Sequence, residues 1–507
     1  MIIYPKDMNS VKTYIRGVFY GLFGMLAAGC EDFLSEKDPS NFNRDNYFTQ
    51  PSHAEAVVTA VYESLYPMHA RQSWLITELR TGMLGSTSSA DGGFPNFALV
   101  RTLKMSADHP SVEAIWESHY RGIGNANMAI QEIPGIQMDE TAKNRLLGET
   151  HFLRAYYYYN LVRLFGPVPL ITSPVDLGSA DLYPSQAGPD EIYQLIVDDL
   201  KQAETSGFPF TSTSGRVTLG AVKALLADVY LTMAGYPLQL GTAYYQLARD
   251  KAKEVIDQGA YSLFDSYDAF RDPSVDNTGE YIFMVQFHET EQPSDALQYG
   301  LTPFKMGISR YASEQGFSYA ERQFVESYDS DDIRARERVF FYKEYTAELD
   351  RTQPVLFNQY YTYKFFDEQA HLETARSGLN WQVIRYGDVL LDFAEASNEL
   401  SGPDEDAYEA INQIRRRAGI PELSGLSQTE FREAIWRERH HELYYEGKVW
   451  FDMVRTRKAF DFVNGTFNDY VGHPFVTGET LSERELLFPI PTAEIRNNPN
   501  LIQNKGY

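Results

Sequence analysis

The sequence predicts a mainly α-helical protein, in which a helical-repeat scaffold carries irregular loops and small β insertions. Three observations indicate this class: long segments with apolar residues at helical spacing, two long stretches without that spacing, and a composition typical of a folded chain. The 507 residues are 43% hydrophobic and 23% charged, which excludes a largely disordered protein. Because 45 Lys and Arg face 70 Asp and Glu, for a net charge of −25, we expect no nucleic-acid partner.

Residues 1–29 are expected to be a secretory signal peptide. Its uncharged run, Gly17–Gly29, would span about 20 Å as a helix, too short for a hydrocarbon core of about 30 Å. Cys30 is the only cysteine, and Leu26-Ala27-Ala28-Gly29-Cys30 resembles the lipobox of bacterial lipoproteins, whose thiol becomes the lipid attachment point. The alternative is an incidental thiol in an uncleaved leader. A polar, lipidated tether over residues 30–50 would then lead into the fold.

Three helices are expected in the N-terminal half, at residues 52–66, 111–133 and 139–165. Asp139 is a suitable N-cap for the third helix, and a Gly-Pro pair follows its end. Tyr156–Tyr159 are consecutive, so steps of about 100° send them around most of this helix. The helix must therefore be covered on more than one side.

Two further helices, 218–234 and 243–257, are expected to form an antiparallel pair. Alanines recur on the first of them and allow a close approach, as in tetratricopeptide units, although no clean 34-residue period is present. Three more helices are expected near 382–399, 404–418 and 427–446. The scaffold is therefore predicted to be tetratricopeptide-like.

The stretches 67–108 and 260–380 differ from this scaffold. They are richer in Gly, Ser, Pro, Asn and Asp, and the periodicity is lost or strand-like, as in EYIFMVQFH from Glu280 to His288. Long excursions of this kind usually carry function. We therefore expect these two insertions to form the ligand face.

Eight blocks of the sequence, in order, resemble the SusD/RagB family of outer-membrane lipoproteins over nearly the whole chain. They are CEDFLSEKDPSNF, WESHYRGIGNANMAI, GETHFLRAYYYYNLVRLFGPVPLI, GRVTLGAVKALLADVYL, VIRYGDVLLDFAEASNEL, INQIRRRAGIP, RERHHELYYEGKVWFDMVR and LLFPIPTAEIRNNPNLIQNKGY. The resemblance implies one SusD-like domain over residues 51–507. It also implies a surface-exposed, lipid-anchored outer-membrane protein that captures glycans and acts as a lid over a SusC-like TonB-dependent transporter. Glu31 and Asp32 resemble the acidic export signal of such lipoproteins.

A glycan site needs aromatic rings that stack on sugar rings and polar groups that hydrogen-bond the hydroxyls. Trp74 lies in the first insertion, whereas the other four tryptophans lie in or against the family blocks. Rings in the insertions are irregularly spaced, which argues against a buried stripe, although any one ring could simply pack against its own loop. Trp74 and Phe97 are the leading candidates. The candidate ligand-binding residues are Arg71, Trp74, Arg80, Phe94, Asn96, Phe97, Tyr299, Phe304, Tyr311, Phe317 and Tyr319.

Catalytic and metal-binding interpretations are weaker. Glu438, Glu442 and Glu446 recur every four residues, but their basic neighbours favour a salt-bridged or buried polar network over a glycosidase pair. The adjacent His440-His441 pair lacks an HExxH motif, and Asp329–Asp332 matches only the start of an EF-hand loop. We therefore expect no catalytic residue and no cofactor, and a structural Ca²⁺ stays open.

The function expected from these features is non-enzymatic capture of an oligosaccharide or polysaccharide and its delivery to the transporter. Three alternatives remain. A RagB-like protein of the same architecture would bind peptides, a helical glycoside hydrolase would release reducing ends, and a purely structural lid would bind no ligand of its own. The sequence names neither the sugar nor its linkage.

Overall fold

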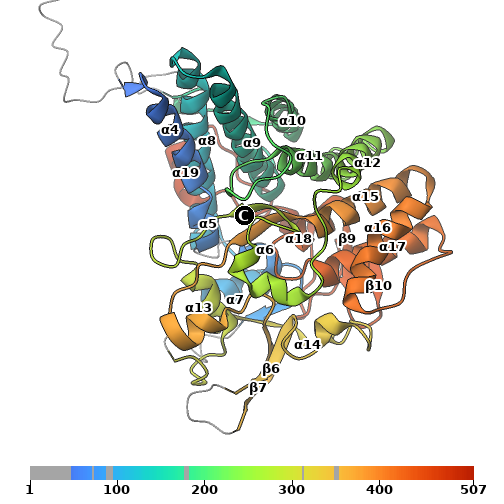
Figure 1. Ribbon diagram of the computed structural model, residues 1–507. Helices are drawn as coiled ribbons and strands as arrows, with labels where there is room; N and C mark the ends of the chain where they lie inside the picture. Colours follow the sequence, from blue (N-terminus) through green and yellow to red (C-terminus); the bar gives the residue numbers. More distant parts are fainter. Residues whose placement is uncertain (1–46, 71–73, 87–94, 176–181, 311–312, 347–352) are drawn as a thin grey trace, which may run out of the picture. The chain divides into compact units, whose positions relative to one another are not determined.

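The computed structural model describes residues 47–507 apart from 71–73, 87–94, 176–181, 311–312 and 347–352, and residues 50–507 form one compact unit (Figure 1). Its α-helices are α4 Pro51–Glu63, α5 Tyr66–Ala70, α6 Leu75–Leu79, α7 Pro95–Arg101, α8 Pro110–Glu132, α9 Glu140–Phe165, α10 Pro189–Glu204, α11 Leu219–Ala234, α12 Thr242–Asp257, α13 Asp295–Leu301, α14 Arg322–Val325, α15 Tyr386–Ser401, α16 Glu405–Ala418, α17 Gln428–Glu442, α18 Val449–Thr456 and α19 Thr492–Asn497. Its strands are β1 Leu84–Ser86, β2 Val168–Pro169, β3 Gln186–Ala187, β4 Tyr281–Val285, β5 Ser318–Ala320, β6 Phe341–Tyr345, β7 Val355–Thr362, β8 Trp381–Arg385, β9 Lys458–Asp461 and β10 Thr466–Asp469. The predicted mainly helical class is confirmed.

Helices α4, α8 and α9 pack together in the N-terminal half. The α9 helix begins after Asp139, whose carboxylate accepts a hydrogen bond from the Ala142 N–H at 2.9 Å, and it ends at Gly166, which has a φ of 70°. Both boundaries agree with the prediction. The four tyrosines Tyr156–Tyr159 are all buried, as expected for a helix that is covered on several sides.

The predicted helix pair is present as α11 and α12, which pack against each other and against α15. Ala221, Ala224 and Ala227 are fully or nearly fully buried, which is how the neighbouring helices approach α11 closely.

Two predicted C-terminal helices are shorter in the structure. The segment expected as 382–399 begins with strand β8, and helix α15 starts only at Tyr386. The segment expected as 427–446 ends at Glu442, because Tyr445 and Gly447 have φ values of 65° and 74° that no α-helix allows. In both segments the apolar residues continue past the point where the helical conformation begins or ends, so the apolar pattern did not mark the helix boundary.

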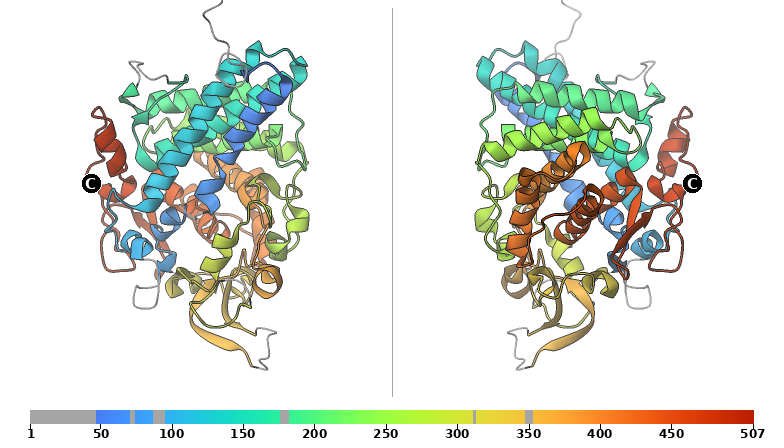
Figure 2. Two further views of the ribbon diagram at one scale, coloured as in Figure 1. Left: turned by 90° about the vertical axis from the view of Figure 1, so that its left-hand side faces the viewer. Right: turned by 90° about the vertical axis from the view of Figure 1, so that its right-hand side faces the viewer.

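Strands β4, β5, β6 and β7 lie in the second insertion. Strand β4 confirms the strand-like stretch after Glu280 and pairs antiparallel with β8, next to the scaffold helices. A separate four-stranded sheet has the order β1-β5-β7-β6. Figure 2 shows β6 and β7 at the end of this unit opposite to helices α8–α12.

Candidate functional site

The two insertions, which residues 109–259 separate in the sequence, meet in one part of the molecule. Strand β1 from the first insertion pairs antiparallel with β5 from the second, with Gly85 opposite Tyr319. The rings of Phe97 and Phe317 also meet across this junction, with their centroids 5.6 Å apart. The region formed by α7, α13, β1 and β5 is called the insertion face below (Figure 1).

Trp74, a leading candidate for a bare ring, is buried. Only 5% of it is exposed, and its ring centroid lies 4.3 Å from that of Trp381 and 5.3 Å from that of Tyr445. The expectation that Trp74 presents a free stacking surface is therefore wrong. Its partners lie more than 300 residues away in the sequence, so local spacing could not reveal the contact.

Arg80 is also buried, with no exposed surface. Its guanidinium donates hydrogen bonds to the carbonyl oxygens of Glu485 and Leu487 at 3.0 and 3.1 Å and to the Tyr507 hydroxyl at 2.7 Å. It also lies 4.1 Å from the centroid of the Phe488 ring. Arg80 thus fastens the C-terminal segment to the fold and is not placed to touch a surface ligand.

Phe97 and Phe317 are 9% and 5% exposed, so both belong to the core beneath the insertion face. The Phe317 ring occupies the space that a side chain at position 300 would need, since a Cβ on Gly300 would lie 2.1 Å from it. The expectation that these two rings are bare is therefore also wrong. They support the face instead.

The remaining described candidates reach the surface to different degrees. Tyr299, Phe304 and Tyr319 are half-buried, and Asn96 is exposed. The Tyr319 ring lies over the backbone of Gly85, where a Cβ would come within 2.1 Å of it. Arg71, Phe94 and Tyr311 lie outside the described residues.

The half-buried rings lie on neighbouring segments. The backbone N–H groups of Gln315 and Gly316 donate to the Tyr299 carbonyl at 3.0 and 3.1 Å, so the chain leading into β5 runs beside the end of α13. The stretch that carries Phe304 follows α13 directly. These rings therefore share one region.

The sequence analysis missed the groups that surround Phe304. The Lys305 ammonium lies 4.8 Å from the centroid of that ring, and Lys305 and Arg310 are both exposed. The Glu314 carboxylate fixes the loop between them, because it accepts the backbone N–H groups of Gly307 and Ser309, each at 2.7 Å. No local pattern marks such a carboxylate, since its partners are backbone groups.

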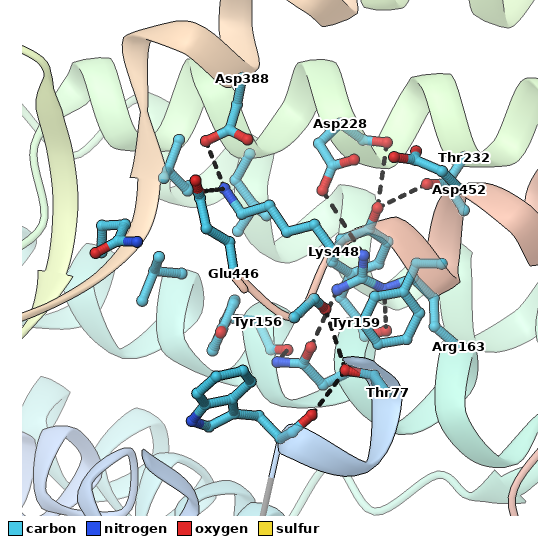
Figure 3. A pocket seen from close by; sticks show the side chains of 18 of the residues that line it. Thr77, Tyr156, Tyr159, Arg163, Asp228, Thr232, Asp388, Glu446, Lys448 and Asp452 are labelled. Carbon is cyan, nitrogen blue, oxygen red and sulfur yellow. Dashed lines mark hydrogen bonds and ion pairs between the residues drawn. The ribbon is translucent and has the colours of Figure 1, made fainter. Parts of the chain in front are cut away.

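A separate interior cavity of about 100 Å³ lies where the N-terminal and C-terminal helices meet (Figure 3). Lys448 reaches into it and pairs with Asp388 and Glu446. His69 and Gln382 also line it, and each has buried nitrogen atoms without a hydrogen-bond partner among the described residues. This volume is well below the roughly 300–1,000 Å³ that is typical of small-molecule sites. The cavity is therefore not the glycan site.

The predicted polar network of α17 is confirmed. Glu442 is fully buried and lies 2.9, 2.9 and 2.7 Å from the guanidinium groups of Arg334, Arg385 and Arg417. Burial alone would raise the pKa of Glu442, but Arg417, Arg385 and Arg334 together hold it well below its usual range. The carboxylate is ionised and surrounded by cations.

Two neighbouring carboxylates, Glu438 on α17 and Glu446 in the turn after it, are equally enclosed. Glu446 accepts from Lys364 at 2.6 Å and from Arg385 at 2.8 Å, and Glu438 accepts from Arg334 at 2.6 Å. None of these carboxyl groups is more than 4% exposed, so none of them faces a cleft that could hold a sugar. The arrangement does not provide the two accessible carboxyl groups that glycoside hydrolysis needs.

The candidate metal ligands are engaged elsewhere. The Asp332 carboxylate pairs with Arg334 at 2.7 Å, and the ring of His440 lies 2.7 Å from the Trp436 carbonyl. Burial lowers the pKa of His440 to about 4. Within the part of the chain that the structure describes, no three His, Cys, Asp or Glu side chains are grouped to hold a metal ion.

Comparison with known proteins identifies the class. Residues 302–507 match the model of the SusD family, and residues 32–231 match a model described as starch-binding and associating with the outer membrane. A crystal structure of a SusD superfamily protein from Parabacteroides distasonis is 38% identical, with a TM-score of 0.85 over 90% of this chain and 99% of that one. The chain therefore belongs to the SusD family, as its sequence blocks predicted.

Further relatives agree with this assignment. SusD-like protein P2 of Formosa agariphila is 27% identical over 95% of this chain and 98% of its own length. Surface glycan-binding protein A of Bacteroides thetaiotaomicron, solved in complex with laminarihexaose, is 21% identical and has the same fold, with a TM-score of 0.74 over 90% of this chain and all of that one. Among the helices of the described residues, none combines the length and apolarity needed to span a membrane.

Proposed function

We propose that this protein is a lipid-anchored, surface-exposed nutrient-binding protein of the outer membrane that captures a glycan at its insertion face and passes it to a SusC-like TonB-dependent transporter. Glycan binding is supported by a relative of the same fold that was solved with laminarihexaose. We place the binding site at the insertion face because Tyr299, Phe304 and Tyr319, all half-buried, are grouped there on adjoining segments. Half-buried rings keep one part fixed in the protein and offer the rest to the apolar face of a sugar.

Polar groups beside these rings supply the second requirement for sugar binding. The exposed Asn96 belongs to the first insertion, and the exposed Lys305 and Arg310 belong to the second. Amide and cationic groups donate hydrogen bonds to hydroxyl oxygens in defined directions. Phe97 and Phe317 would act beneath the face, as packed supports.

The test is affinity electrophoresis of the mature protein through gels that contain different polysaccharides, laminarin among them. We expect retention by at least one neutral polysaccharide and a loss of affinity of tenfold or more in the triple variant Tyr299→Ala, Phe304→Ala, Tyr319→Ala. Tyr244→Ala is the matched control, because Tyr244 is equally half-buried but lies on scaffold helix α12. Unchanged retention of the triple variant would show that the insertion face is not the site, and retention by no polysaccharide would contradict glycan binding.

The anchor and the transporter are tested separately. Cys30→Ala should release the protein from the membrane fraction if the thiol carries the lipid, and an affinity-tagged protein should copurify with a TonB-dependent barrel after mild solubilisation. Incubation with the bound glycan should release no reducing ends, because the protein is proposed to bind and not to cleave. A rise in reducing ends that survives further purification would contradict this.

A further inference from the structure

A second open site lies away from the insertion face. It is a groove of about 740 Å³, within the range of about 300–1,000 Å³ that is typical of small-molecule sites. The end of α9, the loop after α11, helix α18 and the C-terminal segment form its walls, and no described residue of either insertion lines it. It is called the Arg457 groove below.

Arg457 is the central charged group of this groove. It follows the last residue of α18 with a φ of 57°, is half-buried, and donates one hydrogen bond to the Val454 carbonyl at 3.2 Å. Its guanidinium lies 4.8 Å from the centroid of the Tyr236 ring. No carboxylate in the described part of the chain lies within ion-pair distance of it, and burial lowers the pKa of Arg457 despite the attraction of Glu483.

The other cations that line the groove are already engaged. Arg455 pairs with Glu395 at 2.6 Å, and Lys505 pairs with Glu483 at 2.7 Å. The Arg163 guanidinium lies over two aromatic rings, 3.5 and 4.0 Å from their centroids. Among the described cations that line the groove, Arg457 is therefore the one that has no carboxylate partner and that lies over a single aromatic ring. It stays without such a partner although the chain has a net charge of −25.

We propose that the Arg457 groove binds an anionic sugar residue, a uronate or a sugar sulfate, whose acidic group pairs with Arg457. A planar guanidinium presents several N–H donors that match a carboxylate or sulfate in bidentate fashion, and an anion would offset the cost of holding this charge half-buried. Tyr236, 37% exposed, and Val471, 48% exposed, provide apolar surface for the sugar ring beside the charge. The inference extends the proposed function, since it assigns a second, charge-selective site for carbohydrate.

The experiment uses the mature protein and measures affinity for polygalacturonate, for a sulfated galactan and for neutral laminarin, each at low and moderate salt. Arg457→Asn removes the charge, and asparagine tolerates the positive φ. The matched control is Arg338→Asn, because Arg338 has a φ of 64° and lies 4.9 Å from the Tyr345 ring centroid but is outside the groove. Tyr236→Ala is a second variant that leaves Arg457 in place.

We expect at least one anionic polymer to bind, with tenfold or greater weakening by Arg457→Asn, a smaller weakening by Tyr236→Ala, and no change with Arg338→Asn. The polymer that binds distinguishes a uronate from a sulfate. Laminarin binding should not respond to any of these groove variants. The test of the Arg457 groove therefore stays valid even if the insertion face proves not to bind glycan. The proposal is overturned if neither anionic polymer binds, if Arg457→Asn binds as well as the unaltered protein, or if poly-glutamate competes as strongly as the polysaccharide.

Discussion

The buried charge at Glu442 gives the sharpest test of how this fold is held together. Three guanidinium groups lie within 2.9 Å of its carboxylate, and none of the groups involved is more than about 4% exposed. Glu442→Gln keeps the shape but leaves these buried cations short of one negative charge. Breaking a buried ion pair in this way typically costs about 3–5 kcal/mol, so we expect a loss of stability of that size.

Urea unfolding followed by tryptophan fluorescence measures this loss. The matched control is Glu409→Gln, because Glu409 pairs with Arg416 while their side chains are 57% and 43% exposed. Surface pairs of this kind contribute about 0–1 kcal/mol, so the control should unfold almost as the unaltered protein does. A loss below about 1 kcal/mol for Glu442→Gln, or an equal loss for both variants, would refute the view that this cluster is a structural core.

Three further variants test packing and titration. In α8, a Cβ on Gly122 would lie 2.4 Å from the Tyr157 ring, whereas a Cβ on Gly124 would meet nothing within 4 Å. Gly122→Ala should therefore reduce stability by about 1–3 kcal/mol and lower the melting temperature. Gly124→Ala should raise the melting temperature slightly. Trp74→Ala should cost about 3–5 kcal/mol in urea unfolding, yet leave the glycan affinity of the folded protein unchanged. Burial raises the pKa of Glu78 from 4.5 to about 8, so the folded state retains a proton that the unfolded state loses, and the contribution of this group to stability should fall as pH rises from about 5 to 8. Glu78→Gln should flatten that fall, by about 2–4 kcal/mol across the interval, and an unchanged pH profile in thermal unfolding would contradict the assignment.

The scaffold could be predicted because its signals are local. Each of these signals acts within a few residues of where it occurs: the N-cap at Asp139, the Gly-Pro pair that ends the helix after residue 165, and the alanine face on α11. Where the prediction of a helix from residue 382 was wrong, a non-local interaction decided the conformation. Residues 382–385 have helix-compatible apolar spacing, but pairing with β4 makes them a strand.

The candidate site could be predicted only at the level of regions. Both insertions were identified, but their pairing through β1 and β5 joins segments that share no local signal. The exposure of each ring depends on partners far away in the chain, as Trp381 shows for Trp74. Arg457 was missed for a related reason. What distinguishes it is that no carboxylate among the described residues lies within ion-pair distance, and the sequence does not display this.

The buried ion cluster explains how the second insertion is held on the helical scaffold. Glu280, Arg334 and Lys364 all come from the second insertion and are fully buried, and they pair with groups on α16, α17 and β8 or in the turn after α17. An ion pair across such a junction loses most of its favourable energy if one partner moves away, because the remaining charge stays buried. The cluster therefore fixes the base of the insertion, and its charged members do not include the half-buried rings Tyr299, Phe304 and Tyr319. Changes in those rings can alter ligand preference without disturbing the attachment of the insertion to the helices.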